Sequence, residues 1–258
     1  MGLFVTIAIA ACIASLLSFF SGFGLGTILT PVFAVFFPVE VAIALTGIVH
    51  LLNNLFKFSL TAKSVNVAVL LKFGLPSMLG AFGGALLLKQ IDEATPIYMY
   101  EIGNYPCNIT LLKLLVAVLM IVFTLLEVIP YFKNLQADNN KLFGGGLLSG
   151  FFGGLSGHQG ALRSIFLVRS GLSKNAFIAT GVAIACLVDL IRLPIYFSGK
   201  GSAVMSENLN ILLVALGASF IGAFAGNILL KKVTIELVQK MVMVMILLLA
   251  MALGAGII

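Results

Sequence analysis

The residues of this chain that could do chemistry are a few polar side chains set inside long apolar stretches. The densest group is Ser156, Gly157, His158 and Gln159, followed shortly by Arg163. A guanidinium presents a planar fork of donors that matches an oxyanion. A histidine can bind a substrate or take up a proton near neutral pH. We therefore expect all five residues to line an anion-binding site.

A second group lies on one predicted helix, where Asp189 and Arg192 are three residues apart and can pair with each other. Ionisable groups inside a membrane are candidates for a functional site. We expect Asp189, Arg192 and His50 to serve proton or charge coupling. Three alternatives stay open: Arg163 pairs with Asp189 only structurally, Arg192 reaches the membrane surface, or His50 is a contact between helices.

Asn53, Asn54 and Lys57 form a third group inside an apolar stretch. Asn53 and Lys57 share one helix face through their i,i+4 spacing. Asparagine amides can donate to an anion, and we predict that all three residues contribute to the substrate site. The alternatives are that one asparagine caps the unwound backbone of a neighbouring segment and that Lys57 extends to the membrane surface.

A glycine-rich segment, Ser21–Thr27, interrupts the uncharged apolar run between residues 4 and 37. This run is too long for one membrane crossing and too short for two, so a helix break is expected. Backbone groups freed at membrane depth must face protein or a water-filled cavity. We expect Pro31 in the first turn of the second piece, whose free amides suit an anion. A close-packing surface is the alternative. The candidate substrate-binding residues here are Ser21, Gly24, Gly26 and Thr27.

The elements that position these residues follow from composition. The chain has 258 residues, of which 61% are hydrophobic and only 9% are charged, and its mean hydropathy is +1.18. These values exclude a soluble domain, and the continuous apolar runs exclude a β-barrel. The fold class is an all-α polytopic membrane protein embedded in the lipid bilayer. Cys12, Cys107 and Cys186 have no metal or redox spacing, and Cys107 is expected in a polar loop. We expect no cofactor, no metal and no nucleic-acid partner, and a homo-oligomer is left open.

The second half of the chain repeats the first. Gly80–Lys89 and Gly222–Lys231 are identical at seven of ten positions, and each closes the third long segment of its half when the broken segment is counted as the first. The expected first repeat is 1–132, with a broken hairpin at 2–37 and spans near 41–60, 67–88 and 109–131. The expected second repeat is 142–258, with a hairpin at 142–169 and spans near 173–197, 208–230 and 235–257.

The basic residues indicate how the two repeats are oriented. If each broken segment enters and leaves the membrane on one side, each half crosses three times and the second half is inverted. The chain then places most basic residues on one face and the acidic residues on the other, as the positive-inside rule favours. The basic face would be cytoplasmic and both termini would be outside. The basic group is Lys63, Lys72, Lys133, Lys141, Arg169, Lys174, Lys231, Lys232 and Lys240. The opposite group is Lys89, Lys113, Lys200, Asp92, Glu93, Glu101, Glu40 and Glu207.

Two motifs resemble the sulfite exporter TauE/SafE family of membrane permeases. Phe20–Pro31 resembles the opening motif of that family, and Gly150–Arg163 resembles the start of its second repeat. The resemblance covers nearly the whole chain. It implies a secondary transporter that moves sulfur-containing anions, such as sulfite, sulfonates and thiosulfate, across the bacterial inner membrane, usually outward.

The second motif departs from the family pattern, in which many members carry a richer glycine run followed by a proline. Here His158 and Gln159 replace part of that run, and Ile165 stands where the first repeat has Pro31. This departure makes the second break more polar than the first. We expect His158, Gln159 and Arg163 to determine substrate selectivity.

The function expected from these observations is secondary transport by alternating access, not enzymatic catalysis. A sulfite or organosulfonate ion would bind at the membrane midplane between two half-helix N-termini. An anion channel is one alternative, because sequence does not separate a channel from a carrier. A membrane-embedded enzyme or assembly factor is the other. The latter is disfavoured because the two histidines lie in different segments and the cysteines form no pair.

Overall fold

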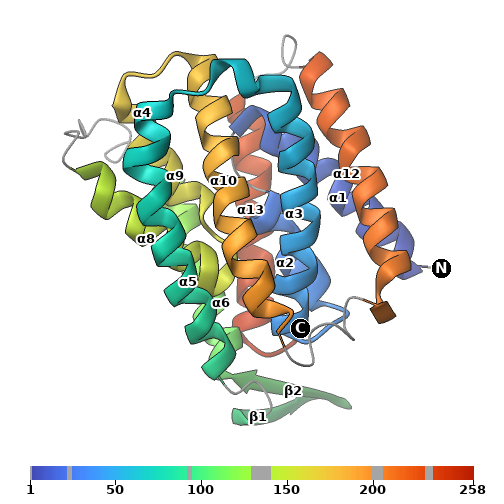
Figure 1. Ribbon diagram of the computed structural model, residues 1–258. Coiled ribbons are helices and arrows are strands. Elements are labelled where there is room, and N and C mark those ends of the chain that lie inside the picture. The colour runs from blue at the N-terminus through green and yellow to red at the C-terminus, as the bar shows by residue number, and fades with distance from the viewer. Residues whose placement is uncertain (1, 22–24, 92–94, 129–140, 199–205, 230–234) are drawn as a thin grey trace.

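A computed structural model shows a bundle of helices with one β hairpin projecting from its end (Figure 1). The structure describes residues 2–21, 25–91, 95–128, 141–198, 206–229 and 235–258. Within these residues, four helical segments are long and apolar enough to cross a membrane: Val39–Ser64, Val67–Gln90, Lys174–Tyr196 and Leu209–Gly226. The chain is therefore an α-helical membrane protein, as its composition predicts.

The described elements of the first half begin with a broken helical segment and continue into longer helices. Their bounds are α1 (Gly2–Ser21), α2 (Leu25–Ala34), α3 (Val39–Thr61), η1 (Ala62–Ser64), α4 (Val67–Val69), η2 (Leu70–Gly74), α5 (Leu75–Gln90), β1 (Pro96–Ile102), β2 (Tyr105–Thr110) and α6 (Leu111–Val128). The turn η2 is π-helical and directly precedes Pro76 at the start of α5. Because a proline cannot donate to the preceding turn, local widening of the helix at this point is expected. Pro31 lies well inside α2, so its expected place in a first turn is wrong.

The second half follows the same order of a broken segment and longer helices. Its described elements are α8 (Lys141–Ser156), α9 (Gly160–Leu167), η3 (Val168–Ser170), α10 (Lys174–Tyr196), α12 (Leu209–Leu229) and α13 (Ile235–Gly254). The helices α10, α12 and α13 thus follow the broken pair α8 and α9, as α3, α5 and α6 follow α1 and α2.

The β hairpin is the feature that the sequence did not predict. The sequence predicts a polar loop around Cys107, but β1 and β2 pair antiparallel there around Gly103, whose φ is +64°. The hydroxyl of Tyr100 donates to the carbonyl of Ala255 at 2.6 Å, which ties the hairpin to the C-terminal residues. Cys107 is buried in β2 and does not lie in a polar loop. The apolar helix expected from residue 109 begins two residues later, at Leu111.

Close contact between α5 and α8 depends on glycines. A Cβ added to Gly150 or Gly154 would collide with the backbone of Ser77 or Ala81, respectively. These helices therefore pack backbone against backbone, as small residues allow inside membranes. The contact joins the first helix of the second half to the third long segment of the first half.

A matching contact joins α1, the first helix of the first half, to α12, which corresponds to α5 in the second half. A Cβ on Gly222 of α12 would collide with the carbonyl of Cys12 in α1, and the same holds for Gly80 of α5 against Leu147 of α8. Gly80 and Gly222 are the first residues of the two similar ten-residue motifs. The repeated motif thus makes the same kind of contact in both halves.

The helices α3 and α10 cross the middle of the bundle side by side and run in opposite directions (Figure 1). Gly47, near the start of α3, lies against Arg192 near the end of α10. The backbone amide of Asn66, which follows α3 and η1, donates to Thr180 Oγ1 near the start of α10, at 2.9 Å. Each half therefore contributes one helix to the centre.

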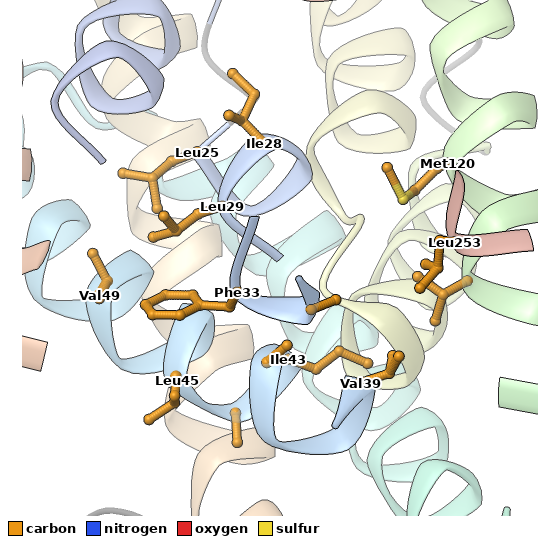
Figure 2. Close-up of a cluster of buried hydrophobic side chains, with 14 of the residues drawn as sticks. Leu25, Ile28, Leu29, Phe33, Val39, Ile43, Leu45, Val49, Met120 and Leu253 are labelled. Carbon is orange, nitrogen blue, oxygen red and sulfur yellow. The ribbon is translucent and has the colours of Figure 1, made fainter. Parts of the chain in front are cut away.

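An apolar core surrounds this centre. Figure 2 shows Leu29 and Phe33 of α2 beside Ile43 and Val49 of α3, with side chains of α6 and α13 nearby. All four labelled residues of α2 and α3 named here are at most 1% exposed. Polar groups buried inside such a core cost free energy unless they find hydrogen-bond partners, so a buried polar cluster here needs an explanation.

Candidate functional site

The two helix breaks meet inside the protein. In the first half, α1 ends at Ser21 and α2 begins at Leu25; in the second, α8 ends at Ser156 and α9 begins at Gly160. A Cβ on Gly26 would lie 3.2 Å from the carbonyl oxygen of Gly157, so the two breaks are in contact. Two segments about 130 residues apart in sequence therefore form one region.

The backbone conformation at position 157 requires a glycine. Its φ is +82°, a conformation that glycine adopts at low cost and other residues avoid. A Cβ there would also lie 3.1 Å from Nη1 of Arg192. The second break thus brings its backbone against a guanidinium of α10.

A buried ionic cluster of α3 and α10 lies beside the breaks. Asp189 Oδ2 is 2.6 Å from His50 Nδ1, and Asp189 Oδ1 accepts from Arg192 Nε at 2.8 Å. Asp189 is fully buried and Arg192 is 1% exposed. The expected pairing of Asp189 with Arg192 is present, and Arg192 does not reach the surface. His50 joins α3 to α10, so it makes a contact between helices, whatever further role it has.

The same cluster holds the broken end of α8. Arg192 Nη1 donates to the carbonyl oxygen of Gly153 at 3.0 Å, and Gln159 Nε2 lies 3.4 Å from Asp189 Oδ1. The hydroxyl of Tyr196 donates to the carbonyl oxygen of Gly154. Carbonyls in the last turn of a helix lack partners within the helix. The carbonyl of Gly153 also accepts from the amide of Gly157 at 3.0 Å, so Arg192 and Tyr196 of α10 hold the last turn of α8 at the second break.

Polar side chains of α3 hold the end of α1 through bonds between side chains. Lys57 Nζ donates to Ser18 Oγ at 2.8 Å, and Ser15 Oγ donates to Asn53 Oδ1 at 3.1 Å. Lys57 is 4% exposed, so it does not extend to the membrane surface. These bonds hold the last turns of α1 against α3, next to the first break. Asn54 faces the ionic cluster instead, because its amide nitrogen is 3.1 Å from His50 Nδ1.

Arg163 and His158 line the second break. Both are buried, at 3% and 1% exposure. The ring of His158 contacts Ser156 Oγ at 3.1 Å. Arg163 lies in the first turn of α9, and a Cβ on Gly181 of α10 would be 3.5 Å from its Nε.

Among the described buried residues, cations outnumber carboxylates. The described buried residues include three cations, Lys57, Arg163 and Arg192, and one carboxylate, Asp189. Burying cations costs free energy unless negative charge compensates them. The region also holds buried polar atoms that have no hydrogen-bond partner among the described residues: the donors Arg192 Nη2, Asn53 Nδ2 and Thr30 Oγ1, together with His158 Nε2 and the acceptor Gln159 Oε1. A cluster of cations and open donors suits an anion.

The described candidate residues of both breaks, of α3 and of α10 lie in or beside this one region. Thr27 follows Gly26 in α2 and is half-buried. Gly24 and the side chain of Ser21 lie outside the described residues. Sequence reasoning missed three residues. Ser15 and Ser18 of α1 bond Asn53 and Lys57 of α3, and Tyr196 of α10 bonds the carbonyl of Gly154 in α8. The only signal for the two serines was their i,i+3 spacing in an otherwise apolar helix.

Comparison with known proteins identifies a family for almost the entire chain. A family model described as sulfite exporter TauE/SafE matches residues 7–253. No curated protein and no solved structure matches the chain. The family match includes both helix breaks and every buried charged residue described above.

Proposed function

The chain belongs to the sulfite exporter TauE/SafE family of membrane transporters, and from this premise we propose that it is a secondary transporter that exports a small sulfur-containing anion. One observation carries the proposal for this particular chain. The two helix breaks touch at Gly26 and Gly157, Arg192 lies against Gly157, and Lys57 of α3 and Arg163 in the first turn of α9 are two further buried cations.

The anion binds between the first turns of α2 and α9, near the midplane of the membrane. Free amides at a helix start attract an anion, and the helix dipole adds to the attraction. Arg163 supplies a planar guanidinium in the first turn of α9. His158 and Gln159 stand next to it and are buried, so they contact the distal oxygens or the organic part of the substrate and set selectivity.

An inverted repeat explains how the site opens to each side in turn. Exchanging the two halves maps the contact of α1 with α12 onto that of α8 with α5, and it maps the α3–α10 and α6–α13 contacts onto themselves. The antiparallel course of α3 and α10 fits a twofold axis in the plane of the membrane. Rocking of one half against the other around the fixed site would give alternating access.

The membrane orientation follows from the basic residues. Lys63 and Lys174 lie at the end of the bundle where α3 ends and α10 begins, and Lys89 and Lys113 lie at the end with the β hairpin. The positive-inside rule then places the first end in the cytoplasm and the hairpin outside. In a bacterium the membrane would be the inner membrane.

The test is a binding screen on purified protein in detergent. Sulfite, sulfate, thiosulfate, sulfoacetate and taurine are titrated by calorimetry. At least one anion is expected to bind, and Arg163→Gln is expected to weaken its affinity about 30-fold, the equivalent of about 2 kcal/mol for a lost charge-assisted contact. Arg163→Lys should restore only part of the loss, because an ammonium lacks the planar fork.

The matched control is Lys89→Gln, which removes a cation at the exposed end of α5. It is expected to bind with wild-type affinity. Equal affinities for the Arg163→Gln and Lys89→Gln variants would contradict the proposed site. Failure of the folded wild-type protein to bind any of the five compounds would contradict the proposed substrate class.

A further inference from the structure

We propose that His50 is a proton-binding site of this transporter and that it takes up a proton when the anion binds. The inference rests on the proposed transport function and deepens it by naming an ion that binds together with the anion. Among the buried histidines, His50 has the contacts that a coupling group requires: a carboxylate across the interface of the two halves and the anion region at its side.

The carboxylate contact is short and crosses between the halves. His50 Nδ1, on α3, lies 2.6 Å from Asp189 Oδ2, on α10. Rocking of the halves against each other would change this contact, because α3 and α10 form the centre of the bundle. The conformational change that moves the anion would therefore also change how tightly His50 and Asp189 hold a proton.

The anion region adjoins the ring itself. A Cβ on Gly26, at the start of α2, would lie 3.9 Å from His50 Cδ2 and 3.2 Å from the carbonyl of Gly157. The ring thus touches the place where the two breaks meet. A charge on the ring and a charge on a bound anion would interact over a short distance in surroundings with little water to screen them.

Charge balance links the two binding events. With His50 neutral, Asp189 and Arg192 compensate each other, since they are 2.8 Å apart. Protonation of His50 leaves the three groups with one net positive charge, added to the charges of Lys57 and Arg163. A bound anion offsets that charge. Each event therefore favours the other, and by linkage the effect is equal in both directions.

The groups that face His50 are consistent with this role. The groups in direct contact with its ring are Asp189 of α10, at 2.6 Å, and the amide of Asn54 on its own helix, at 3.1 Å. Arg192 of α10 and Gln159 of the second break contact the same carboxylate. Arg163 of α9 and Lys57, two turns further along α3, are the other buried cations, and the described residues of α1, α2 and α12 include no ionisable side chain except Cys12.

His158 is the natural comparison because it is equally buried. Its described side-chain partner is the hydroxyl of Ser156, not a carboxylate. Its neighbour Gly157 lies against Arg192, and no carboxylate among the described residues pairs with the ring of His158 to compensate an added proton. The carboxylate contact therefore distinguishes the two histidines and assigns the proton to His50.

The experiment measures protons directly. Thiosulfate, sulfate and sulfoacetate do not take up a proton near neutral pH, and the tightest-binding of them is titrated into wild-type protein by calorimetry in buffers of different ionisation enthalpy. If only sulfite binds, the proton uptake of the wild type is compared with that of His50→Gln, because the protonation of sulfite itself contributes to both. We expect about one proton taken up per anion, and a dissociation constant that rises about tenfold per pH unit above the pKa of the histidine.

The variants identify the group that takes the proton. His50→Gln, which keeps an amide donor for Asp189, should bind the anion with no proton uptake and no pH dependence. His158→Gln should still take up a proton, whatever its affinity. Anion binding by the wild type without proton uptake, or proton uptake retained in His50→Gln, would overturn the inference and leave the transport proposal standing. Absence of any anion binding would overturn both.

Discussion

Replacing Asp189 by asparagine tests the buried ionic cluster most sharply. The carboxylate accepts from Arg192 Nε at 2.8 Å and contacts His50 Nδ1 at 2.6 Å, and it is fully buried. Asparagine has nearly the same shape and keeps one acceptor oxygen, but it removes the charge. Arg192 then stays buried without its counter-ion.

The expected cost is large. Removing one partner of a buried ion pair typically destabilises a protein by about 3–5 kcal/mol, and the acceptor that asparagine retains places Asp189→Asn toward the lower end of that range. A control is Glu101→Gln, which neutralises an exposed carboxylate on β1 and should change stability by less than about 0.5 kcal/mol.

The double variant separates a pair from two independent residues. In Asp189→Asn/Arg192→Gln the uncompensated charge is gone, so the loss should be smaller than the sum of the two single losses by about 1 kcal/mol or more. The assay is reversible unfolding in detergent for the wild type, both single variants and the double variant. Strict additivity, or an Asp189→Asn variant as stable as the control, would refute this reasoning.

Three further predictions follow from the packing and the topology. Gly157→Leu should abolish anion binding in protein that still inserts, as measured by calorimetry, because φ is +82° and a side chain would meet Arg192. Gly150→Leu should prevent stable folding, judged by size-exclusion chromatography, whereas Gly144→Leu should not, because nothing lies within 4 Å of a Cβ there. Lys63→Cys should react with an impermeant thiol reagent only from the cytoplasmic side and Lys89→Cys only from outside; labelling of both from one side would contradict the proposed orientation.

The buried polar residues of the candidate site could be predicted from the sequence because polar groups are rare inside this chain. In a stretch as apolar as 142–168, the run from Ser156 to Arg163 has few explanations other than a polar site. The same reasoning found Asn53, Lys57 and Asp189. A buried polar group in a membrane needs a partner, so its type alone carries information.

The partners of these groups could not be predicted in the same way. Asp189 could pair along its own helix with Arg192, which spacing suggested, or across the bundle with His50, which spacing does not reveal. Ser15 and Ser18 resemble packing residues until α3 is placed beside them. Such contacts depend on tertiary arrangement and leave no periodic signal.

The β hairpin was missed for a related reason. A two-stranded hairpin is marginally stable by itself, and its sequence signal is correspondingly weak. Here the C-terminal residues support it through the bonds from Tyr100 to Ala255 and from the amide of Asn108 to the carbonyl of Gly256. Those partners are about 150 residues away in sequence, so no local pattern could reveal them.

The measurement that tests the central claim most directly is transport by the purified protein alone. The wild type and Arg163→Gln are reconstituted into liposomes loaded with sulfite, and efflux is followed without any other protein or nucleotide present. We predict saturable sulfite efflux from wild-type liposomes and at least about tenfold slower efflux with Arg163→Gln at low sulfite, since a lost charge-assisted contact weakens binding by more than that factor. Efflux no faster than from protein-free liposomes, or equal rates for the two proteins, would contradict the account.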